Sequence, residues 1–539
     1  MERALVAEVM AWIADDPDPV TASQLQTLLD NEDEAALRTY FSGFLQFGTA
    51  GLRGPNGPGP SSMNRAVVGR AAAGIAAYMK ARGMTRVVIG RDARYGSADY
   101  AIESAEIFSG AGMEVFLLPR PLPTPVLAFA TTALKADVGV MVTASHNPPQ
   151  DNGYKVYIGP DADGIAYASS QIVNPTDGFI AAEIAAITTL ASQPRDQKWT
   201  VIAETLIDEY VQRTAALGKN PGSLKIVYTA MHGVGTETLA HVFKLAGFPD
   251  LILVKEQAEP DPDFPTVAFP NPEEPGAIDL ALATARTHNA DLVIANDPDA
   301  DRCAAAIKGR DGQWRMLRGD ELGVIFGEWI ARTSPRGTFG NSIVSSSILR
   351  KISAHYRIDF KEVLTGFKWL AKIEDLAFGY EEAIGYAVDS ETVNDKDGIS
   401  AAIFLAQIAT DLAAVGKDLN DLLDEVWLRH GFHATEQISI RVADMGAITK
   451  LLAGLRSNPP QEIAGRSVES IDDLAAPTDG LPPTDGLRLW LSGGVRIIIR
   501  PSGTEAKLKC YIEVITPDQQ SAEKELNSLR APLKAFLGA

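Results

Sequence analysis

Three aspartates at every second position give the strongest chemical signal in the sequence. Asp297, Asp299 and Asp301 directly follow a short apolar run, so a buried strand is expected to carry them onto one tight loop. Their carboxylates would repel one another unless a cation or arginines compensate, and hard oxygen ligands suit Mg²⁺. An EF-hand loop is excluded because Arg302 and Lys308 stand where it needs glycine and glutamate. A solvated acidic turn is the alternative.

A serine on a polar loop is the candidate nucleophile. Ser145 follows the β-branched segment 137–142, which is typical of a buried parallel strand, and ligands bind at the carboxyl ends of such strands. With His146, Asn147 and Lys155 nearby, this serine could be a positioned nucleophile or a phosphate carrier. An ordinary turn, in which serine and asparagine bond the local backbone, fits the spacing equally well.

Two other segments could bind phosphate. Residues 47–54 (FGTAGLRG) combine three glycines with Arg53, although a flexible loop with a solvated arginine also fits. Residues 500–505 (RPSGTE) follow an apolar strand and offer one arginine, two hydroxyls and a backbone nest. Lys509 lies two strand periods after Glu505 and can face the same side. A plain turn is the alternative for this second segment.

The region around residues 380–398 contains candidate sugar contacts. Glu381 and Glu382 offer hydroxyl acceptors, but their spacing alone favours a solvent-facing acidic turn. Lys396 lies between two aspartates and could contact substrate or donate a proton, and a surface salt bridge is equally consistent with its neighbours. Together, a serine, a magnesium loop, hydroxyl acceptors and a distal phosphate cradle predict phosphoryl transfer on a small phosphorylated polyol.

Composition limits the classes of partner. The chain has 539 residues, which implies three or four domains, and a formal net charge of −20. This acidic balance argues against nucleic acid and anionic membranes, since both require clustered basic residues. The two cysteines, Cys303 and Cys510, predict neither a disulfide framework nor a cysteine zinc site, so a reducing cytoplasm is expected. We expect no signal peptide and no transmembrane helix.

The pattern of elements that must position these residues is α/β. Residues 1–45 are predicted to be helices packed on the first domain, with Thr21 and Ser23 as possible N-caps. Helices and strands then alternate, which implies largely parallel or mixed sheets. The proline-rich stretch 260–275 and residues 468–487 are expected to be loops, and 341–345 a strand. We predict domains at 1–205, 206–317, 318–430 and 431–539, the last a smaller α+β domain.

Six ordered motifs carry a resemblance to a known family. They are FGTAGLRG (47–54), TASHNPPQDNGYKVY (143–157), DPDADR (297–302), TGFKWL (365–370), GYEEAIGY (379–386) with DKDG (395–398), and RPSGTE (500–505). The chain resembles the α-D-phosphohexomutase superfamily, that is, phosphoglucomutases and phosphomannomutases. The resemblance implies four domains around a central cleft, three of them α/β with mixed sheets and the fourth a smaller α+β domain.

The resemblance also implies a mechanism and a set of site residues. The enzyme would be an isomerase and a phosphoprotein: phosphorylated Ser145 would give its phosphoryl group to the sugar, forming a hexose 1,6-bisphosphate that reorients and returns the other group. Mg²⁺ would be held by the phosphoserine and the three aspartates. Catalytic roles fall to Ser145, His146, Lys155, Arg53 and Lys396. Substrate binding falls to Arg302, Thr365, Gly366, Glu381, Arg500, Ser502, Gly503, Thr504 and Lys509.

One departure from the family pattern affects the substrate. Many members carry Glu-x-Ser in the sugar loop, which corresponds to residues 379–386 here, whereas this chain has Ala383 in place of the serine. This form resembles the branch with longer bacterial phosphosugar mutases and animal phosphopentomutase-like enzymes. Glucose phosphates are the leading expectation, with mannose or pentose phosphates as alternatives, and the protein would act as a cytoplasmic monomer or homodimer. A sugar-phosphate phosphatase and an inactive sugar-phosphate-binding protein are the hypotheses from other classes.

Overall fold

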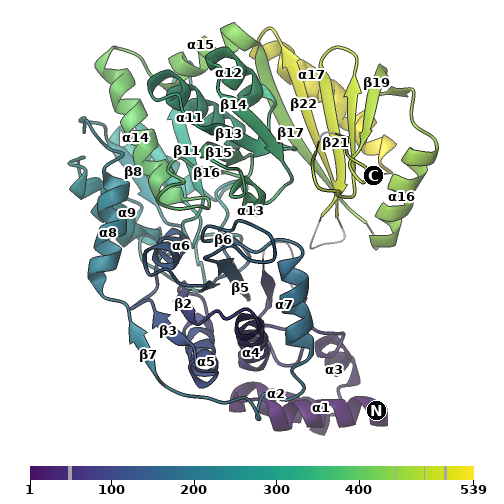
Figure 1. Cartoon of the computed structure of the whole chain (residues 1–539). Helices are drawn as coiled ribbons and strands as arrows, with labels where there is room; N and C mark the ends of the chain where they lie inside the picture. Colours follow the sequence, from purple (N-terminus) through teal and green to yellow (C-terminus); the bar gives the residue numbers. More distant parts are fainter. Residues whose placement is uncertain (47–50, 443–444, 479, 503–506, 539) are drawn as a thin grey trace. The chain divides into compact units, whose positions relative to one another are not determined.

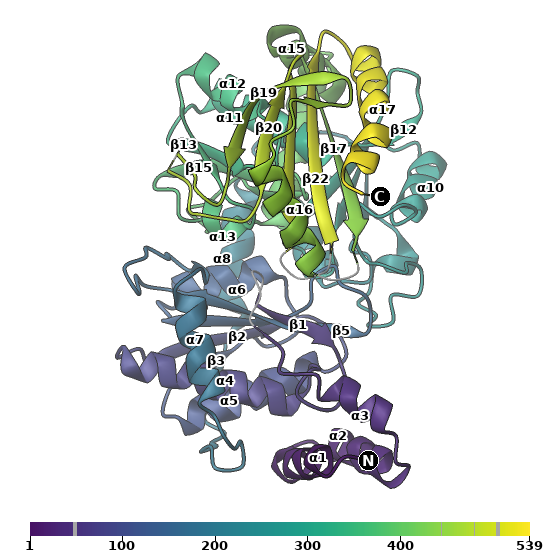
Figure 2. The same cartoon turned by 90° about the vertical axis from the view of Figure 1, so that its right-hand side faces the viewer.

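The computed structural model describes residues 1–46, 51–442, 445–478, 480–502 and 507–538 (Figures 1 and 2). The chain divides into two compact units. The first contains Met1–Met316 and Gly385–Thr410, and the second contains Leu317–Ile384 and Asp411–Ala539. The first unit is therefore built from two separate stretches of sequence.

Helices open the chain, as predicted: α1 (Arg3–Asp15), α2 (Pro19–Asp30) and α3 (Glu34–Tyr40). They pack on the first α/β domain, where Arg70 of α4 donates a hydrogen bond of 2.7 Å to Asp15. The predicted caps Thr21 and Ser23 are wrong, because both lie inside α2. Asp18 is the N-cap and accepts from the backbone of Val20, with a proline at the first helical position.

The first sheet has the strand order β1-β5-β4-β2-β3-β7, with β6 paired to β5. It is mixed, because β4 runs parallel to β2 and antiparallel to β5. Every residue of β4 is buried, as expected for a strand covered on both faces. The strands are β1 (Leu52–Pro55), β2 (Arg86–Arg91), β3 (Glu114–Leu117), β4 (Val138–Val142), β5 (Asp151–Ile158), β6 (Ser170–Gln171) and β7 (Trp199–Val201). The helices of this domain are α4 (Arg65–Ala81), α5 (Ser97–Gly110), α6 (Thr124–Ala133) and α7 (Thr176–Ala185).

The second sheet has the order β12-β11-β10-β8-β9 and is also mixed. Its strands are β8 (Ile226–Thr229), β9 (Ile252–Leu253), β10 (Leu292–Asn296), β11 (Cys303–Lys308) and β12 (Trp314–Met316). Its helices are α8 (Glu204–Ala215), α9 (Gly235–Leu245), the 3₁₀ turn η1 (Lys255–Gln257) and α10 (Asp279–His288). The proline-rich segment 260–275 contains neither helix nor strand, as predicted.

The second unit contains the third α/β domain, in which β13 pairs in parallel with both β14 and β15. Its elements are α11 (Gly319–Thr333), β13 (Thr338–Ser342), α12 (Ile348–Tyr356), β14 (Asp359–Val363), α13 (Phe367–Leu370), β15 (Leu376–Glu381) and α15 (Leu419–His430). Strand β13 ends at Ser342, earlier than the predicted 341–345. The chain turns there, since the backbone of Ser345 bonds to the carbonyl of Ser342.

The C-terminal domain is an antiparallel sheet of order β17-β22-β21-β20-β19-β18. Figure 2 shows α16 and α17 beside this sheet. Its elements are β17 (Phe432–Arg441), α16 (Met445–Ser457), β18 (Glu462–Ile463), β19 (Arg466–Asp473), β20 (Leu487–Leu491), β21 (Val495–Pro501), β22 (Lys507–Thr516) and α17 (Gln519–Phe536). The predicted loop 468–487 is wrong at its start, because residues up to Asp473 belong to β19 and pair with β20.

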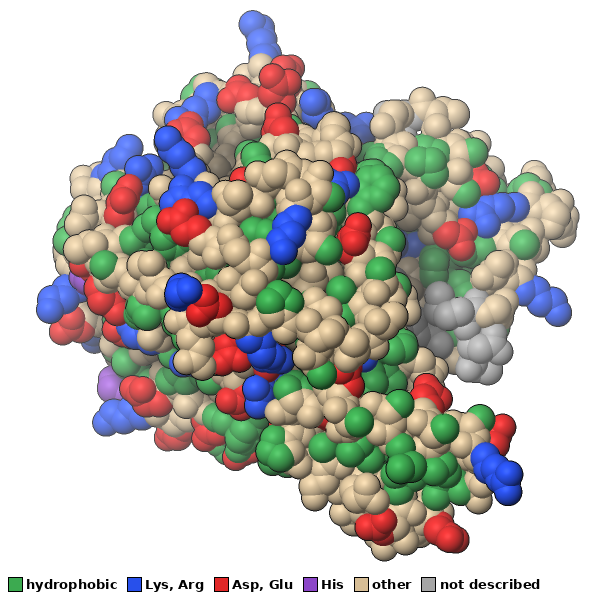
Figure 3. All heavy atoms as spheres, turned by 60° about the horizontal axis from the view of Figure 1, so that its bottom comes forward, with side chains coloured by type: hydrophobic (Ala, Val, Ile, Leu, Met, Phe, Trp, Pro, Cys, Tyr) green, Lys and Arg blue, Asp and Glu red, His purple; other side chains and the backbone are tan. Residues whose placement is uncertain are grey.

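The predicted fold class is confirmed: three α/β domains with mixed sheets precede an antiparallel C-terminal domain. The remaining elements are β16 (Gly385–Ala387) and α14 (Gly398–Ala414). Among the described residues no single helix has the length and apolar character of a membrane span, although α14 and α15 meet that criterion as a bent pair. On the face shown in Figure 3, acidic and basic side chains are interspersed. Cys303 and Cys510 are both buried and unbridged.

Candidate active site

The aspartate loop is the turn between β10 and β11. Asp297, Asp299 and Asp301 are all fully buried, and one oxygen from each lies within 4.8 Å of the others. Ala300 makes this tight turn with a left-handed backbone (φ 54°). The solvated acidic turn that the sequence left open is therefore wrong, because no side chain of the three reaches water.

Two buried lysines offset the charge of this loop. Lys155 of β5 places its Nζ 2.6 Å from Oδ2 of Asp299 and 2.6 Å from Oδ2 of Asp301. Lys396 places its Nζ 2.8 Å from the same oxygen of Asp301. The surface salt bridge considered for Lys396 is thus excluded, because its side chain lies in the buried cluster.

The three carboxyls differ in their proton affinity. Burial, together with the charges of Asp299 and Asp301, raises the pKa of Asp297 far above its usual value. Burial also opposes ionisation of Asp299, but the ammonium of Lys155 and its hydrogen bond hold the pKa of Asp299 well below the usual range. Burial lowers the affinity of Lys396 for its proton, yet Asp301 and Asp395 outweigh it and raise the pKa.

The residues fit a divalent cation. Oδ1 of Asp299 and Oδ1 of Asp301 are buried and have no hydrogen-bond partner among the described residues. Two orphaned carboxylate oxygens beside a third buried carboxylate form a hard-oxygen ligand set, which is the chemistry that Mg²⁺ prefers. The cluster is therefore consistent with the predicted magnesium site.

The serine loop, residues 143–150 between β4 and β5, contacts the aspartate loop directly. Ser145 is buried, and its hydroxyl donates a hydrogen bond of 2.6 Å to Oδ2 of Asp297. Its oxygen also lies 3.2 Å from Nδ1 of His146. The backbone of Ser145 is left-handed (φ 52°), a strained conformation that is enriched at functional sites. The hydroxyl is thus aimed at the carboxylate cluster rather than at its own loop.

The remaining predicted residues of the first unit surround this centre. Arg53, at the start of β1, donates to Oδ1 of Asn147 across 3.4 Å, and burial lowers its pKa. Arg302 places its backbone N–H 3.0 Å from Oδ1 of Asp297, and its Nε lies 3.9 Å from Asp301. Burial and the nearby cations of Arg302 and Arg53 hold the pKa of His146 well below its usual value. The imidazole is therefore neutral.

Arg94 is a site residue to which the sequence assigned no role. Its guanidinium donates to the main-chain carbonyls of Ser145, Asn147, Pro148 and Asp151 at 2.6, 2.7, 2.8 and 3.1 Å. It thereby fixes the shape of the serine loop from one side. Its partners are carbonyl oxygens distant in sequence, so no residue pattern marks the contact.

Thr124 is a second missed residue. At the start of α6, its hydroxyl donates 2.6 Å to Oδ2 of Asp299 and its backbone N–H donates 2.9 Å to the carbonyl of the same residue. The signal that could have found it is its position in a proline-rich turn directly after β3, at the sheet edge where ligands bind.

The segment that carries Lys396 is clamped by tyrosines. Asp395 accepts hydrogen bonds of 2.8 Å from Tyr157 of β5 and from Gln171 of β6. Tyr210 of α8 donates to both oxygens of Asp397 at 3.0 and 3.1 Å. Both aspartates beside Lys396 are therefore fixed by other elements of the first unit, which orients the lysine between them.

The predicted sugar loop lies in the second unit. Glu381 ends β15, and its Oε1 accepts a hydrogen bond of 2.6 Å from the backbone of Gly366. This bond brings Glu381 together with the predicted Thr365–Gly366 contact. Glu382 differs, because the hydroxyls of Ser342 and Ser345 donate to its Oε2 at 3.1 and 3.0 Å. Its role is thus to hold the loop on the end of β13.

The predicted phosphate cradle also lies in the second unit. Arg500 of β21 and Lys509 of β22 are directly opposite each other in the antiparallel ladder, so their side chains share one face. Ser502 follows β21, is buried, and its backbone bonds to the carbonyl of Lys507. Gly503 and Thr504 lie outside the described residues. Burial raises the pKa of Tyr511, as do the charges of Glu382 and Glu381, whereas the charge of Arg500 lowers it.

Comparisons with known proteins identify the same family along most of the chain. Models described as phosphoglucomutase/phosphomannomutase alpha/beta/alpha domains I, II and III match residues 45–174, 207–311 and 318–430, and the model of the C-terminal domain matches 455–527. A "Probable phosphomannomutase" of Haemophilus influenzae is 45% identical over 86% of this chain and 95% of its own length. A phosphopentomutase of Mus musculus is 34% identical over 98% and 94%.

Two other relatives extend the comparison. A human glucose 1,6-bisphosphate synthase is 32% identical over 96% of this chain and 92% of its own. The crystal structure of a phosphoglucomutase/phosphomannomutase family protein from Burkholderia thailandensis superposes with a TM-score of 0.72, covering 92% and 98% of the two chains at 20% identity. This structural likeness concerns the fold.

Proposed function

This chain belongs to the phosphoglucomutase/phosphomannomutase family of the α-D-phosphohexomutase superfamily and is thus a phosphosugar mutase, and we propose that it interconverts mannose 1-phosphate and mannose 6-phosphate. Pentose 1- and 5-phosphates are the second candidates. Glucose, the leading expectation from the sequence, has less support, since the relatives reported above include a phosphomannomutase and a phosphopentomutase.

The observation that carries the proposal is the contact between Ser145 and the aspartate cluster. A serine hydroxyl 2.6 Å from a carboxylate, beside Lys155, Lys396 and Arg302, is placed where negative charge moves during phosphoryl transfer. Bound Mg²⁺ would neutralise charge on the transferring group, and the three aspartates would hold it.

The chain's own residues supply the remaining steps. In the proposed reaction the bond between phosphorus and Oγ of Ser145 breaks, a new bond forms between phosphorus and a sugar hydroxyl oxygen, and the proton that this hydroxyl loses is taken up by Oγ. His146 is neutral, and its Nδ1 lies 3.2 Å from Oγ of Ser145, so we assign it the positioning of this oxygen during the transfer. Lys396 enters the cycle protonated, because Asp301 and Asp395 stabilise its ammonium, so we assign it charge stabilisation and proton donation on the return step.

The second unit would recognise the substrate. We propose that Glu381, Thr365 and Gly366 contact the sugar hydroxyls. Arg500 and Lys509, with Ser502 and the undescribed Gly503 and Thr504, would bind the phosphate that is not transferred. A cradle made for a phosphate alone can accept either end of a hexose 1,6-bisphosphate, as a reorienting intermediate requires.

The organisation of the protein supports action on small sugar phosphates in the cytoplasm. Both cysteines are unbridged, which is consistent with a reducing compartment. We propose domains ending near residues 205, 317 and 430, a division supported by the four matched segments. We propose a monomer or homodimer, which light scattering after gel filtration distinguishes.

Phosphorus NMR tests the proposed function. Mannose 1-phosphate, ribose 1-phosphate and glucose 1-phosphate are offered separately with Mg²⁺ and a trace of the matching bisphosphate, using wild type and Ser145→Ala. We expect conversion to the 6- or 5-phosphate, fastest with mannose, and no conversion by the variant. Release of inorganic phosphate faster than isomerisation would instead identify a phosphatase, and a faster rate with glucose would refute the mannose assignment.

A further inference from the structure

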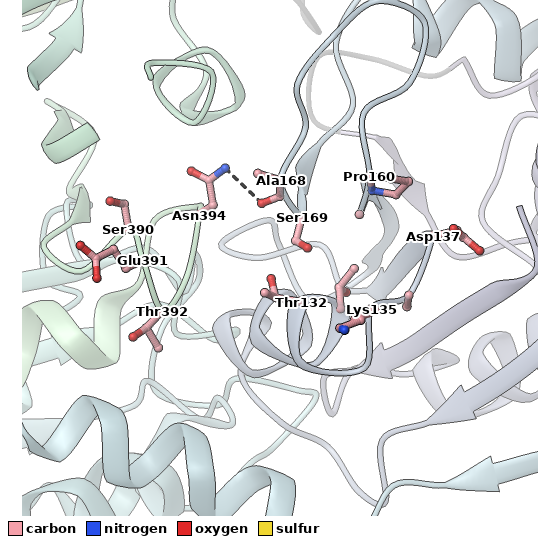
Figure 4. Close-up of a pocket in the computed structure, with 13 residues that line it drawn as sticks. Thr132, Lys135, Asp137, Pro160, Ala168, Ser169, Ser390, Glu391, Thr392 and Asn394 are labelled. Carbon is pink, nitrogen blue, oxygen red and sulfur yellow. Dashed lines mark hydrogen bonds between the residues drawn. The ribbon is translucent and has the colours of Figure 1, made fainter. Parts of the chain in front are cut away.

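A cavity of about 390 Å³ opens in the first unit, at the end of β4 opposite the serine loop. Its walls are the last turn of α6, the start of β4, the loop after β5, and the segment 390–394 that leads to Lys396 (Figure 4). We call it the side pocket. Its volume lies in the range of small-molecule sites, roughly 300–1,000 Å³.

Two of the hydroxyl side chains that line the side pocket are available to a ligand. Ser169 and Thr392 are 4% and 9% exposed, and their hydroxyls make no side-chain hydrogen bond within the described part of the chain. Figure 4 shows Ser169 and Thr132 directed toward the open space. Both hydroxyl oxygens are accessible from the pocket, so a ligand there can form hydrogen bonds with them. Ala168 and Ser169 also share left-handed backbones (φ 47° and 62°), a strain common at ligand clamps.

The charges of the lining argue for an uncharged ligand. Lys135 is the single cation among the lining residues, Glu391 is acidic, and the carboxylate of Asp137 accepts hydrogen bonds from the backbone of Thr85 and Arg86. The lining therefore offers a phosphate a single lysine, in contrast to the arginine-rich surroundings of Ser145. Hydroxyls beside the apolar surfaces of Ala168 and Pro160 match a molecule that alternates O–H and C–H groups.

We propose that the side pocket binds an uncharged sugar of monosaccharide size, and that the bound sugar regulates the enzyme through Lys396.

The connection to Lys396 is short. Asn394 borders the pocket and donates 3.1 Å to the carbonyl of Ala168 on the opposite wall (Figure 4). The next residue, Asp395, is held by Tyr157 and Gln171, which lie two residues from the pocket residues Gly159 and Ser169. A ligand that spreads or tightens these walls therefore moves the clamp that orients Lys396.

Saturation-transfer NMR with D-mannose and D-ribose tests binding on the full-length protein. Thr132→Phe should fill the pocket from an exposed position on α6. Ala133→Phe is the control, because it adds the same ring at the next residue, which is also exposed but does not line the pocket. We expect a signal in wild type and Ala133→Phe that is lost in Thr132→Phe. Ser169→Ala with Thr392→Val, which removes hydroxyls without adding bulk, should weaken binding at least tenfold. Absence of a signal in wild type, or an undiminished signal in Thr132→Phe, would overturn the proposal.

Mutase kinetics test the regulatory half. With the sugar at a saturating concentration, kcat should change at least twofold in wild type and Ala133→Phe and stay constant in Thr132→Phe. An unchanged kcat in wild type with the pocket occupied would refute regulation. An equal change in all three proteins would place the effect at the active site. The binding measurement does not depend on which sugar phosphate the enzyme isomerises.

Discussion

Arg94 donates a hydrogen bond of 2.6 Å to the main-chain carbonyl of Ser145, and the same guanidinium binds further carbonyls of the loop. The reactive serine is thus positioned by a side chain that does not touch its hydroxyl. Five donors in a rigid plane make this possible, and a lysine ammonium cannot reproduce it.

We therefore expect Arg94→Lys to lower kcat by about 10- to 100-fold, at roughly 1.4 kcal/mol per tenfold, with a smaller effect on KM. Initial-rate measurements of sugar-phosphate conversion give both constants. Arg91→Lys is the matched control, because Arg91 is a half-buried arginine at the end of β2 whose guanidinium donates to the carbonyl of its neighbour Asp92 rather than to the serine loop. Equal losses in the two variants would show that Arg94 has no special role in the loop.

The tyrosine clamp on Asp395 is testable with a conservative change. Tyr157→Phe removes the 2.8 Å hydrogen bond to Asp395 and should lower kcat about tenfold, because bonds to charged groups contribute about 1.5–3 kcal/mol. The pH profile of kcat should shift as well, since Asp395 helps to keep Lys396 protonated.

Tyr154→Phe is the control for that experiment. Tyr154 is equally buried on β5, but its hydroxyl bonds to Ser104 at 2.9 Å, away from the lysine. It should lose some thermal stability and keep kcat within twofold. A kcat loss shared by both variants would show that the effect is structural.

Replacing Lys155, which bridges Asp299 and Asp301, should make the stability of the protein depend on bound metal. Lys155→Met leaves Asp299 and Asp301 without their nearest cation, which costs about 3–5 kcal/mol for a broken buried pair. We expect a large fall in Tm in the presence of a chelator and partial recovery on addition of Mg²⁺, whose charge compensates the same carboxylates.

Lys198→Met controls for the loss of a lysine, because its side chain is 84% exposed. Its Tm should match that of wild type with and without metal. Failure of Mg²⁺ to restore any stability to Lys155→Met would contradict a metal site at the aspartate loop.

Asp320 in α11 should contribute less to the free energy of unfolding of the second unit at neutral pH than in mild acid. Burial raises its pKa to about 6, although it accepts hydrogen bonds from Ser346, Tyr380 and Thr435. The folded state thus retains a proton that an unfolded aspartate loses near pH 4. The contribution of Asp320 to stability is greatest below about pH 4, falls as the pH rises to about 6, and is level above that.

Asp320→Asn should abolish this dependence and stabilise the protein at pH 8 by at most about 3 kcal/mol. Urea unfolding from pH 4 to 8 measures it, with the exposed Asp359→Asn as control. Parallel pH profiles for wild type and Asp320→Asn would contradict the argument.

The parts of the site that could be predicted are those whose chemistry is local in sequence. Asp297, Asp299 and Asp301 follow their strand directly, and the strand-to-loop order places them at the sheet edge that receives Ser145. Arg94 and the clamp of Tyr157 could not be predicted, because their partners lie far along the chain and those of Arg94 are carbonyl groups without residue identity. For Thr124 the one available signal was its proline-rich turn after β3.

The fold shows the same division. Apolar β-branched runs such as 137–142 locate buried strands well, because burial on both faces requires them. Strand β19 was predicted as loop because its pattern is polar and partly exposed, and only its pairing with β20 makes it a strand. Whether such a segment forms a strand depends on its pairing with another strand, and a single sequence does not show that pairing.

The second stretch of the first unit, Gly385–Thr410, is synthesised only after residues 317–384 of the second unit. The chain leaves the first unit at Met316 and returns at Gly385, so Lys396 is made well after the aspartate that it neutralises. A nascent chain at that stage carries Ser145, the three aspartates and Lys155, but not the second lysine. The catalytic centre of the N-terminal unit therefore matures only when most of the third domain has been synthesised, and a fragment ending at Met316 would lack one of the two buried lysines that balance its charge.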